Sequence, residues 1–576
     1  MSVYTDIELS KMGIITTTYK AMLNSGRQYP NTISTAHITI CADGRSAVIG
    51  NMQIQGDPDV TTQLKYIVEQ SQYYRDSNGR KRPAHIYYIC ICADIKLLYA
   101  NICNADGVSA YLKTKHEPLY IDLGECLRIV EYSGDPEAYH NICNREGVLM
   151  YTATGIVRNR LKVNWNKQNT WTHDRIESLY PDEQLYRACM RWLYRGGKVF
   201  CTADPNTVYS DVKAADITSA HIYHMLTELY PTTPFQRADP NRAIEAIYHG
   251  LNAILDITFY NVTPRLDIGW ETKTIDVIEP VLDGKGIVYA DTMRVMITDV
   301  DWMTYQKLYN WDHCTVNAAW IAHSNKLPAY LRKTIKDTAR HKQELKHKGV
   351  TGSEYITAKR DVNMLYGMTA QKLNLTTCDK NGKGIEQDYT TAISHKILSP
   401  FWAVWTAAYT RYQQASMIER IVKNGAYCLY GDTDSIYWID KNNNDRSTYI
   451  ERIISDENMR IQSNNKLNGL SEDIADIGTW TIDIYKLFKA LGCKKYMYSD
   501  MQDHINYKCS GILSQAMNNI TFDDFTPDTV IHNARRTICR KSESEAAHYR
   551  YEDIKLDKCA ADVELEHWYI RNVLKI

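Results

Sequence analysis

The sequence lacks several features that would assign a chain to a class at once. Its apolar runs, such as Phe401–Ala408, are far shorter than the about 20 residues that a membrane-spanning helix needs. The fifteen cysteines include no C-x-x-C pair and follow no regular spacing, which argues against a zinc ribbon or a disulfide framework and favours a reducing compartment. Met1–Ser10 shows no basic segment followed by an apolar one, so we expect no secretory signal there.

An excess of charge is also lacking, and phenylalanine is scarce. The formal net charge is −1, which by itself does not indicate a nucleic-acid partner. Basic residues are nevertheless concentrated from Lys326 to Lys348 and from Arg535 to Lys541, and local patches are what bind polyphosphates. Each cluster could equally be the solvated face of a helix. The 42 tyrosines against 7 phenylalanines suit a wet channel in which bases stack, although compositional drift would give the same ratio.

The length of 576 residues predicts about four compact units. Near the N-terminus, alternating residues predict paired strands over His37–Cys41 and Ala47–Ile54, and the apolar run His85–Ala93 predicts a central strand. Helices are expected over Ile95–Ile102 and Pro136–Met150. This part of the chain therefore reads as an α/β unit.

Farther along, helical patterns dominate and are separated by turn-rich segments. The segments with a clear pattern are expected helices at Leu179–Tyr194, Ser219–Leu229, Leu327–Lys348, Glu354–Gly367 and Ala403–Ile421, and an expected strand at Val212–Asp216. The break at Gly349–Gly352 predicts a helical hairpin. The polar, Asn-rich stretch 440–475 reads as an insertion.

One short stretch carries the strongest chemical signal. Asp432 and Asp434 flank Thr433 between two segments rich in strand formers, which predicts a tight β-hairpin with both carboxylates at its tip and on one face. Two anions held together need a cation between them, or one becomes protonated. A solvated acidic hairpin tip is the plainer interpretation. Asp216, at the end of a predicted strand, would complete a carboxylate cluster suited to Mg²⁺ and to two-metal phosphoryl displacement.

A second group of residues has the chemistry to bind a nucleotide. Lys359, Asn363, Tyr366 and Gly367 fall on one face of a predicted helix and offer charge, an amide, an aromatic ring and close approach to the backbone. Arg340, on the preceding basic helix, can add a bidentate phosphate contact. A plain amphipathic helix would give the same spacing.

Three of these segments resemble motifs A, B and C of family B DNA polymerases, in the same order along the chain. They are Asp216-Ile217-Thr218-Ser219, Lys359-x3-Asn363-x2-Tyr366-Gly367 and Tyr430-Gly431-Asp432-Thr433-Asp434-Ser435. Other segments resemble the protein-primed subgroup, found in small phages that replicate linear genomes from a terminal protein. Those segments are Tyr194-Arg195-Gly196-Gly197, Ala408-Tyr409-Thr410-Arg411-Tyr412, Lys494-Lys495-Tyr496, Lys508-Cys509-Ser510-Gly511 and Ile520–Phe525.

The resemblance implies an α/β fold with an α+β palm: a right-hand polymerase with palm, fingers and thumb, and an N-terminal RNase H-like exonuclease-type domain. The implied units are an exonuclease-like domain at 1–175, a linker and first palm segment at 176–229, a terminal-protein-region insertion at 230–325, fingers at 326–373, a second insertion at 374–398, palm at 399–510 and thumb at 511–576. The two insertions imply processive, strand-displacing synthesis.

By the same resemblance, Asp216 and Asp434 would bind two Mg²⁺ ions, with Asp432 in support and Mn²⁺ able to substitute. The residues implied to bind the incoming nucleotide are Arg340, Lys359, Asn363, Tyr366, His221 and Ser219. The residues implied to bind primer and template are Tyr194, Gly196, Gly197, Gly367, Lys494, Tyr496 and Lys508. The implied partners are primer-template DNA, dNTPs and a terminal protein that primes synthesis. We expect a phage-encoded monomer in the host cytoplasm, with no membrane partner.

The sequence departs from the family at motif A and motif B. Motif A continues in the family with Leu-Tyr, whose tyrosine packs under the sugar and excludes a 2′-hydroxyl, but here the pair is Ala220-His221. Motif B has Ser after Asn in the family, and Met364 here. Neutral drift in a divergent member would explain both, and His221 also raises the alternative of a primer-making or sugar-tolerant polymerase. A catalytically silent DNA-binding scaffold is a further alternative.

The N-terminal unit departs further from its expected carboxylate motifs. Where the exonuclease pattern has Asp-x-Glu, Asn-x3-Asp and Tyr-x3-Asp, the sequence offers Cys41-Ala42-Asp43, Cys90-x3-Asp94 and Asn141-x3-Arg145. Asp6-x-Glu8 is a D-x-E, but it precedes any clear strand. Because four carboxylates around two metals are needed for this chemistry, we expect a degenerate domain without exonuclease activity.

Overall fold

The computed structural model describes most of the chain beyond residue 152 and a set of strands before it. The described residues are 16–19, 33–40, 47–49, 52–54, 73–75, 79, 81–83, 87–91, 110–112, 120–123, 127–131, 153–168, 170–266, 268–283, 286–351, 353–373, 375–378, 384–440, 447–539 and 548–556. Among these residues no helix combines the length and the apolar character that crossing a bilayer requires.

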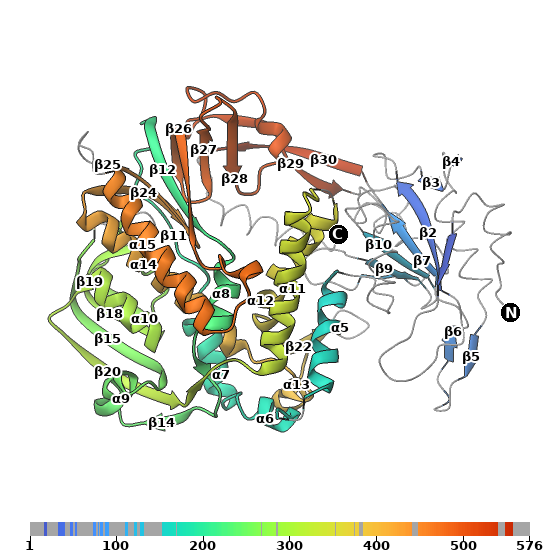
Figure 1. The fold of residues 1–576 in the computed structure, drawn as a ribbon, viewed down its shortest axis with the longest axis horizontal. Coiled ribbons are helices and arrows are strands. Elements are labelled where there is room, and N and C mark those ends of the chain that lie inside the picture. The colour runs from blue at the N-terminus through green and yellow to red at the C-terminus, as the bar shows by residue number, and fades with distance from the viewer. Residues whose placement is uncertain are drawn as a thin grey trace.

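The N-terminal strands form one mixed sheet, shown at the right of Figure 1 in blue. Its described strands are β1 (Thr16–Tyr19), β2 (Ile33–Ile40), β3 (Ala47–Ile49), β4 (Met52–Ile54), β7 (Tyr87–Ile91), β8 (Ala110–Leu112), β9 (Tyr120–Leu123) and β10 (Leu127–Glu131). The expected pairing is confirmed, because β2 pairs antiparallel with β3. The expected central strand is also confirmed, because β7 runs parallel between β2 and β10. A separate small hairpin joins β5 (Tyr73–Arg75) and β6 (Lys81–Pro83). The helices expected over 95–102 and 136–150 lie outside the described residues.

A second sheet carries the motifs that the sequence singled out. Its order is β11-β24-β25-β12-β26-β27-β28, and every neighbouring pair is antiparallel. The strands are β11 (Val199–Cys201), β12 (Tyr209–Ile217), β24 (Ala426–Asp432), β25 (Ser435–Asp440), β26 (Trp480–Gly492), β27 (Lys495–Ser499) and β28 (Ile505–Cys509). Alternate residues of β12 enter two different cores: Ala215 and Ile217 pack on the helical side, and Val212 and Ala214 on the other.

Helices cover one face of this sheet. The helix α14 (Pro400–Lys423) runs directly into β24 and is buried on most of its circumference, with Trp402 and Trp405 fully enclosed. It begins with Ser399 as N-cap and Pro400 in the first turn, as the preferences for helix starts predict. Beside it lies α8 (Ala220–Thr227), the helix that follows β12.

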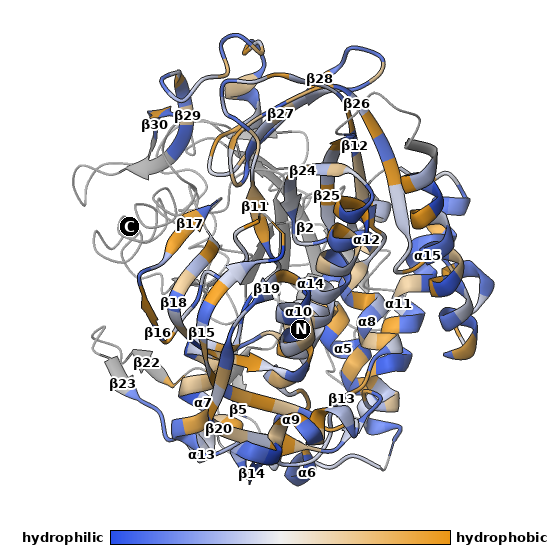
Figure 2. Ribbon diagram, turned by 90° about the vertical axis from the view of Figure 1, so that its left-hand side faces the viewer, coloured by the Kyte–Doolittle hydropathy of each residue, from blue (hydrophilic) through white to orange (hydrophobic). Residues whose placement is uncertain are grey.

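The stretch 440–475 is not only the polar insertion that its composition indicated. It contains α15 (Ser447–Leu467), which packs against α14. Ile450, Ile454 and Ile461 recur at helical spacing and are buried, so a narrow apolar stripe anchors an otherwise polar helix. Figure 2 shows the resulting mixture of apolar and polar residues along α15 and α11.

The helical hairpin predicted after residue 326 is confirmed. It consists of α11 (Ala329–His347) and α12 (Ser353–Thr369), and both pack on α5 (Ala153–Asn166). Upstream, α6 (His173–Glu177), α7 (Glu183–Ala188) and a π-helical turn at Cys189–Leu193 lead to the second sheet.

The region 230–325 is a third sheet with its own helices. It contains β13 (Tyr230–Pro231), β14 (Gln236–Ala238), α9 (Pro240–Tyr248), β15 (Asn252–Pro264), β16 (Asp276–Ile278), β17 (Val281–Asp283), β18 (Gly286–Thr298), α10 (Asp299–Leu308), β19 (Tyr309–Asn310), β20 (His313–Ala322) and β21 (Ser324–Asn325). The helix α10 packs on α14, which joins this sheet to the second one. Figure 1 shows the third sheet below and to the left of β24 and β25.

Short elements complete the described chain. The region 374–398 contains a hairpin of β22 (Thr376–Cys378) and β23 (Gly384–Glu386), followed by α13 (Tyr389–Ile393). After β28, the strands β29 (Val530–Cys539) and β30 (His548–Lys555) form a two-stranded ribbon, which lies at the top of Figure 1. Its apolar side packs with Met497 and Met517 in a small separate core.

Candidate active site

The acidic hairpin forms as predicted, and its two carboxylates have different partners. The strands β24 and β25 pair with Asp432 opposite Ser435, leaving Thr433 and Asp434 in the turn. Thr433 adopts φ 59° and donates its N–H to Lys198 O over 2.7 Å. Because this left-handed residue ends the strand, strand alternation does not itself relate the two aspartates, and their placement on one face stays a prediction.

Asp432 is held by a cation. Lys494 Nζ contacts both of its carboxylate oxygens, and the Lys494 N–H donates to the Tyr430 hydroxyl over 3.0 Å. Lys494 itself adopts φ 61°, in the tight turn between β26 and β27. The charge of Asp432 is therefore largely neutralised within the protein.

Asp434 instead lies beside Asp216. In the sheet Asp216 stands opposite Ser435, and the N–H of Ile217 donates to the carbonyl oxygen of Asp434 over 2.9 Å. Burial, followed by the nearby Asp216 charge, raises the pKa of Asp434 to about 7. Partial burial of its carboxyl group, followed by the charge of Asp483, raises the pKa of Asp216 to about 6. The residue as a whole remains exposed to solvent. The two carboxylates thus repel each other at the meeting point of two strands.

This pair has the donor chemistry of a magnesium site. Mg²⁺ is commonly bound through one or two carboxylates, with the remaining positions taken by water and substrate phosphates. Burial and neighbouring carboxylates raise the pKa values of both groups more than the nearby lysines lower them, so a bound cation would favour their charged forms. In the described part of the chain no three Asp, Glu, His or Cys side chains are gathered to hold a metal, and Asp432 is engaged by Lys494.

Two lysines of the helical hairpin lie near the segment that begins with Asp216. Lys359, exposed on α12, lowers the pKa of Asp216 through its charge. Lys342 of α11 donates to Ser219 Oγ over 3.3 Å, and burial together with the Lys359 charge lowers the pKa of Lys342. Ser219, with φ 53°, ends the segment that follows Asp216 and precedes α8. Two neighbouring ammonium groups, one of which acts on Asp216, suit the binding of a metal-bound polyphosphate.

Arg340 does not join this group. Its guanidinium contacts Ser471 Oγ at 3.2 Å and lies 3.8 Å from the Asp337 carboxylate. Residues two apart on a helix are separated by about 200° around its axis, so Arg340 and Lys342 face different directions. On this helix the cation that contacts the segment after Asp216 is Lys342.

The residues of the predicted nucleotide face do share a face. Lys359, Asn363 and Gly367 are all exposed along one side of α12, and nothing fills the space where a Cβ of Gly367 would stand. Tyr366 is partly covered, because the ring of His221 stacks on it with centroids 4.0 Å apart. This places motif A and motif B side chains in direct contact.

His221 is buried enough to be uncharged. Burial, followed by the charges of His224 and Arg411, lowers the pKa of His221 to about 4. Tyr194 lies next to Tyr366, and burial together with Tyr194 raises the pKa of Tyr366. An uncharged imidazole between the start of α8 and Tyr366 therefore occupies the place where the resemblance implies a tyrosine.

The segment Tyr194–Gly197 reaches the acidic hairpin directly. A Cβ on Gly197 would lie 2.4 Å from Thr433 Cγ2, so only glycine lets this segment pass the turn. Gly196, by contrast, is exposed and has open space around it. Beyond Lys198, β11 pairs with β24 and places Val199 opposite Asp432.

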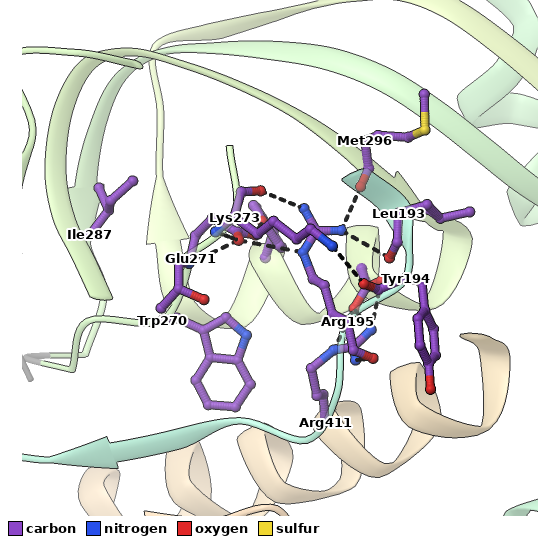
Figure 3. A network of polar contacts seen from close by, with 12 residues as sticks. Leu193, Tyr194, Arg195, Trp270, Glu271, Lys273, Ile287, Met296 and Arg411 are labelled. Carbon is purple, nitrogen blue, oxygen red and sulfur yellow. Dashed lines mark hydrogen bonds and ion pairs between the residues drawn. The ribbon is translucent and has the colours of Figure 1, made fainter. Parts of the chain in front are cut away.

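A polar network fixes the same segment from the other side (Figure 3). Arg195 donates to the carbonyls of Met296, in β18, and of Lys273, and lies 3.4 Å from the Glu271 carboxylate; Glu271 and Lys273 lie between β15 and β16. Arg411 of α14 donates to the carbonyl oxygens of Arg195 and Gly196 over 3.0 and 2.8 Å. It also holds Asp301 in a fully buried bidentate pair, so the segment is attached to two neighbouring substructures at once.

Tyr496 and Lys508 lie on the far strands of the second sheet. Tyr496 is buried, its hydroxyl is 3.1 Å from that of Tyr437, and burial raises the pKa of Tyr496 to about 12. Lys508 is exposed and stands opposite Tyr496 in β28. Of the predicted primer-binding residues, only Lys494 contacts the acidic hairpin through a side-chain charge.

Three contributors were missed by sequence reasoning. Asp483 of β26 raises the pKa of Asp216, but its strand Trp480–Gly492 carries no motif that the sequence reasoning used. Lys342 was one of many basic residues on a helix, and Arg411 was noted only as part of a resembling segment. The carboxylates at issue in the N-terminal unit, Asp43 and Asp94, lie outside the described residues, as do Asn141 and Arg145.

No family model matches the sequence, and no curated protein is significantly similar to it. Solved structures are similar in fold. Phi29 DNA polymerase complexed with primer-template DNA superimposes with a TM-score of 0.61 at 13% identity, covering 94% of this chain and 99% of that one. Its complex with primer-template DNA and incoming nucleotides superimposes with a TM-score of 0.60 at 13% identity, covering 91% of this chain and 99% of that one. Its complex with single-stranded DNA superimposes with a TM-score of 0.59 at 14% identity, covering 94% of this chain and 99% of that one. At this identity the likeness establishes architecture, and the chain has the fold of phi29 DNA polymerase.

Proposed function

We propose that the chain is a template-directed DNA polymerase, which extends a primer hydroxyl by nucleotidyl transfer from dNTPs. The observation that carries the proposal is the pair of neighbouring carboxylates Asp216 and Asp434, with the Lys359 charge acting on Asp216 and with Lys342 bound to Ser219 in the segment that follows it. Two phosphate-binding cations beside an anionic pair suit a metal-bound triphosphate better than either group alone.

Asp216 and Asp434 would hold two Mg²⁺ ions, for which Mn²⁺ can substitute, and Asp432 would support them through its tie to Lys494. The ions would lower the barrier to attack by the primer hydroxyl and stabilise the charge of the leaving pyrophosphate. Lys342 and Lys359 would bind the triphosphate and keep it aligned, and Arg340 stays a prediction for the same role.

The remaining residues would orient the nucleic acid. Asn363, Tyr366 and Gly367 form the open face of α12 on which the nascent base pair would lie, with Ser219 at its edge. The residues that would contact primer and template are Tyr194, Gly196, Gly197, Lys494, Tyr496 and Lys508. Phi29 DNA polymerase, which shares this fold, has been solved with primer-template DNA and incoming nucleotides, which supports this arrangement.

In this proposal the second sheet, with residues 176–229 and 399–510, is the palm, 326–373 the fingers and 511–576 the thumb. The region 230–325 would dock a terminal protein that primes synthesis, and 374–398 would close around DNA and favour strand displacement. Residues 1–175 would keep an exonuclease-type fold without its activity. We further propose a phage-encoded monomer that acts in the host cytoplasm.

The decisive experiment is primer extension on a defined template with Mg²⁺ and dNTPs. The wild-type chain should add templated nucleotides, and Asp434→Asn should reduce the rate by several orders of magnitude while leaving primer-template binding within a fewfold. Asp312→Asn, on the exposed loop after β19, is the matched control. An unchanged extension rate in Asp434→Asn would remove the metal-site assignment, and a wild-type chain that binds primer-template without extending it would favour a DNA-binding scaffold.

A sugar-tolerant polymerase is a second candidate, because His221 and not a tyrosine stacks on Tyr366. Tyrosine is bulkier than histidine, so His221→Tyr should raise the preference for dNTPs over rNTPs by about tenfold or more if position 221 lies under the sugar. The measurement is the ratio of single-nucleotide incorporation efficiencies. A strong dNTP preference already present in the wild type would eliminate this candidate.

Loss of the exonuclease can be tested separately. A labelled primer incubated with Mg²⁺ and no nucleotides should remain intact. Efficient 3′ trimming that survives Asp94→Ala would contradict the proposal of a degenerate domain.

A further inference from the structure

Tyr194 lies where three separate parts of the chain meet. It directly follows the π-helical turn before the second sheet, whereas Lys273 comes from the segment between β15 and β16, and Lys372 from the segment after α12. Lys273 Nζ donates to the carbonyl oxygen of Tyr194 over 2.9 Å (Figure 3). Lys372 Nζ lies 5.5 Å from the centroid of the Tyr194 ring, within the range of a cation–π contact. Two ammonium groups from different elements are therefore held at one aromatic residue.

Positive charge exceeds negative charge around these two lysines. Burial, followed by the charges of Arg195 and Lys372, lowers the pKa of Lys273 to about 8, and the Glu271 charge opposes this only in part. Each of the two buried carboxylates nearby is matched by an arginine: Glu271 lies 3.4 Å from Arg195, and Asp301 is held by the arginine of α14. The ammonium groups of Lys273 and Lys372 remain as a surplus, so an anion beside them would be stabilised.

Both lysines also keep donors for a ligand. An ammonium group has three N–H donors. In the described chain Lys273 gives one of them to Tyr194 O, and Lys372 gives one to Met190 O over 3.3 Å. Lys372 is exposed and Lys273 is only partly buried. The pair can thus donate several charge-assisted hydrogen bonds to an anion with several acceptor oxygens, as a phosphate has.

The place of these lysines along α12 separates them from the proposed triphosphate site. Lys359 lies in the first half of α12, whereas Tyr194 lies next to Tyr366 in its last turn. Seven residues of helix between Lys359 and Tyr366 span about 10 Å. Lys372 follows beyond the end of the helix, so the proposed base-pair face lies between the two groups of cations. A template strand, whose phosphates continue past the nascent base pair, can reach the cations at Tyr194.

We propose that Lys273 and Lys372 bind a backbone phosphate of the single-stranded template beside Tyr194. The third sheet and the segment after α12 would then hold the template together, next to the proposed base-pair face. The contact would not read sequence, because every nucleotide carries the same phosphate. The identity of the ligand rests on the proposed function, whereas the contact itself needs neither metal nor dNTP.

The test is a fluorescence anisotropy titration of the full chain with a labelled single-stranded oligonucleotide in EDTA, between about 50 and 200 mM salt. Lys273→Gln combined with Lys372→Gln should raise the Kd about tenfold at the lowest salt concentration. It should also reduce the slope of log Kd against log salt by about 0.7, the contribution of one phosphate contact to a single strand. Both effects should be the same for oligonucleotides of different sequence.

Three controls separate strand binding from a structural role. Lys372→Gln alone changes an exposed residue and should shift the Kd and the slope in the same direction, whereas Lys372→Arg keeps the charge and should bind like the wild type. Lys423→Gln makes the same chemical change at an exposed lysine of α14 and should leave the Kd within twofold. A blunt duplex, which offers no single-stranded template, should bind equally well to the double variant and to the wild type.

The proposal is overturned if the wild type does not bind the oligonucleotide, or if the double variant and Lys372→Gln leave the salt slope unchanged. It is also overturned if Lys372→Arg binds as weakly as Lys372→Gln, or if the blunt duplex is weakened as much as the single strand. Primer extension keeps this outcome apart from the proposed function. A wild type that extends primers with no lysine-dependent slope refutes only the strand contact, and a lysine-dependent slope without extension refutes only the polymerase.

Discussion

The contact between Gly197 and Thr433 allows a prediction that can be worked out atom by atom. A Cβ at position 197 would lie 2.4, 2.5 and 2.7 Å from Thr433 Cγ2, Oγ1 and Cβ. Carbon atoms in ordinary contact are about 3.5–4.0 Å apart. Rotating the threonine side chain cannot relieve the overlap, because its Cβ is itself too close. The turn is also pinned by the 2.7 Å hydrogen bond from Thr433 N–H to Lys198 O.

Gly197→Ala should therefore destabilise the protein by about 1–3 kcal/mol, the usual cost of overpacking. Thr433→Gly alone should change stability by no more than about 1 kcal/mol. It removes the 3.1 Å contact of Thr433 Oγ1 with Asp432, but it also relieves a left-handed backbone that disfavours side chains. In the double variant the alanine has no side chain to meet, so most of the cost of Gly197→Ala should disappear.

The assay is thermal unfolding of the four proteins of this double-mutant cycle, with primer extension as a second measurement. A coupling free energy of about 1–3 kcal/mol is expected, and for a chain of 576 residues that unfolds as one unit it should appear as a melting temperature about 1–2.5 °C lower in Gly197→Ala alone. Gly196→Ala is the control, because open space surrounds that residue and the variant should melt like the wild type. The reasoning is refuted if Gly197→Ala costs as much in the Thr433→Gly background as in the wild type, or no more than Gly196→Ala.

Two further predictions concern charge. The pKa of Asp434 is raised to about 7 in the folded chain. Between about pH 4 and pH 7 the folded state therefore holds a proton that the unfolded chain has already released. The stability of the metal-free protein should fall as the pH rises through this range. Melting temperatures measured in EDTA should fall with pH over this range. Both Asp434→Asn and added Mg²⁺ should make that pH dependence weaker. A pH dependence unchanged by the variant would contradict the assignment. Arg411→Met should destabilise the fold by about 3–5 kcal/mol, because it strands the buried Asp301 charge. Chemical denaturation of Arg411→Met and of Arg411→Met combined with Asp301→Leu measures this, and the double variant should be the more stable of the two.

The sequence predicted those parts of the site that depend on local pattern. Strand formers around Gly431-Asp432-Thr433-Asp434 are sufficient to predict a hairpin, and the spacing of Lys359, Asn363 and Gly367 is sufficient to predict a shared helix face. Both forecasts depend only on the period of one element. The central strand β7 was predictable for the same reason, since a continuous apolar run suits a strand covered on both faces.

The parts that the sequence did not predict depend on contacts between elements. Helix α11 carries basic residues on several sides, so its sequence cannot tell whether Arg340 or Lys342 faces Asp216. Asp483 comes near Asp216 only because β26 pairs with β12 in one particular register. Likewise, the left-handed turn at Thr433, which separates Asp432 from Asp434, follows from its contact with Gly197 and Lys198 and not from its own residue type.

These tertiary contacts explain why the three carboxylates are not equivalent. Lys494 neutralises Asp432 and ties the acidic hairpin to the turn between β26 and β27, whereas Asp216 and Asp434 are left to repel each other. A fully paired cluster would be more stable without metal, but it would have little affinity for a cation. A cluster with no paired member would concentrate three charges on a turn held by few hydrogen bonds. Because Lys494 pairs with Asp432 and leaves Asp216 and Asp434 to a cation, the hairpin can fold without metal and still favour a divalent ion. Lys494→Met should therefore lower the stability of the metal-free protein more than that of the metal-bound protein.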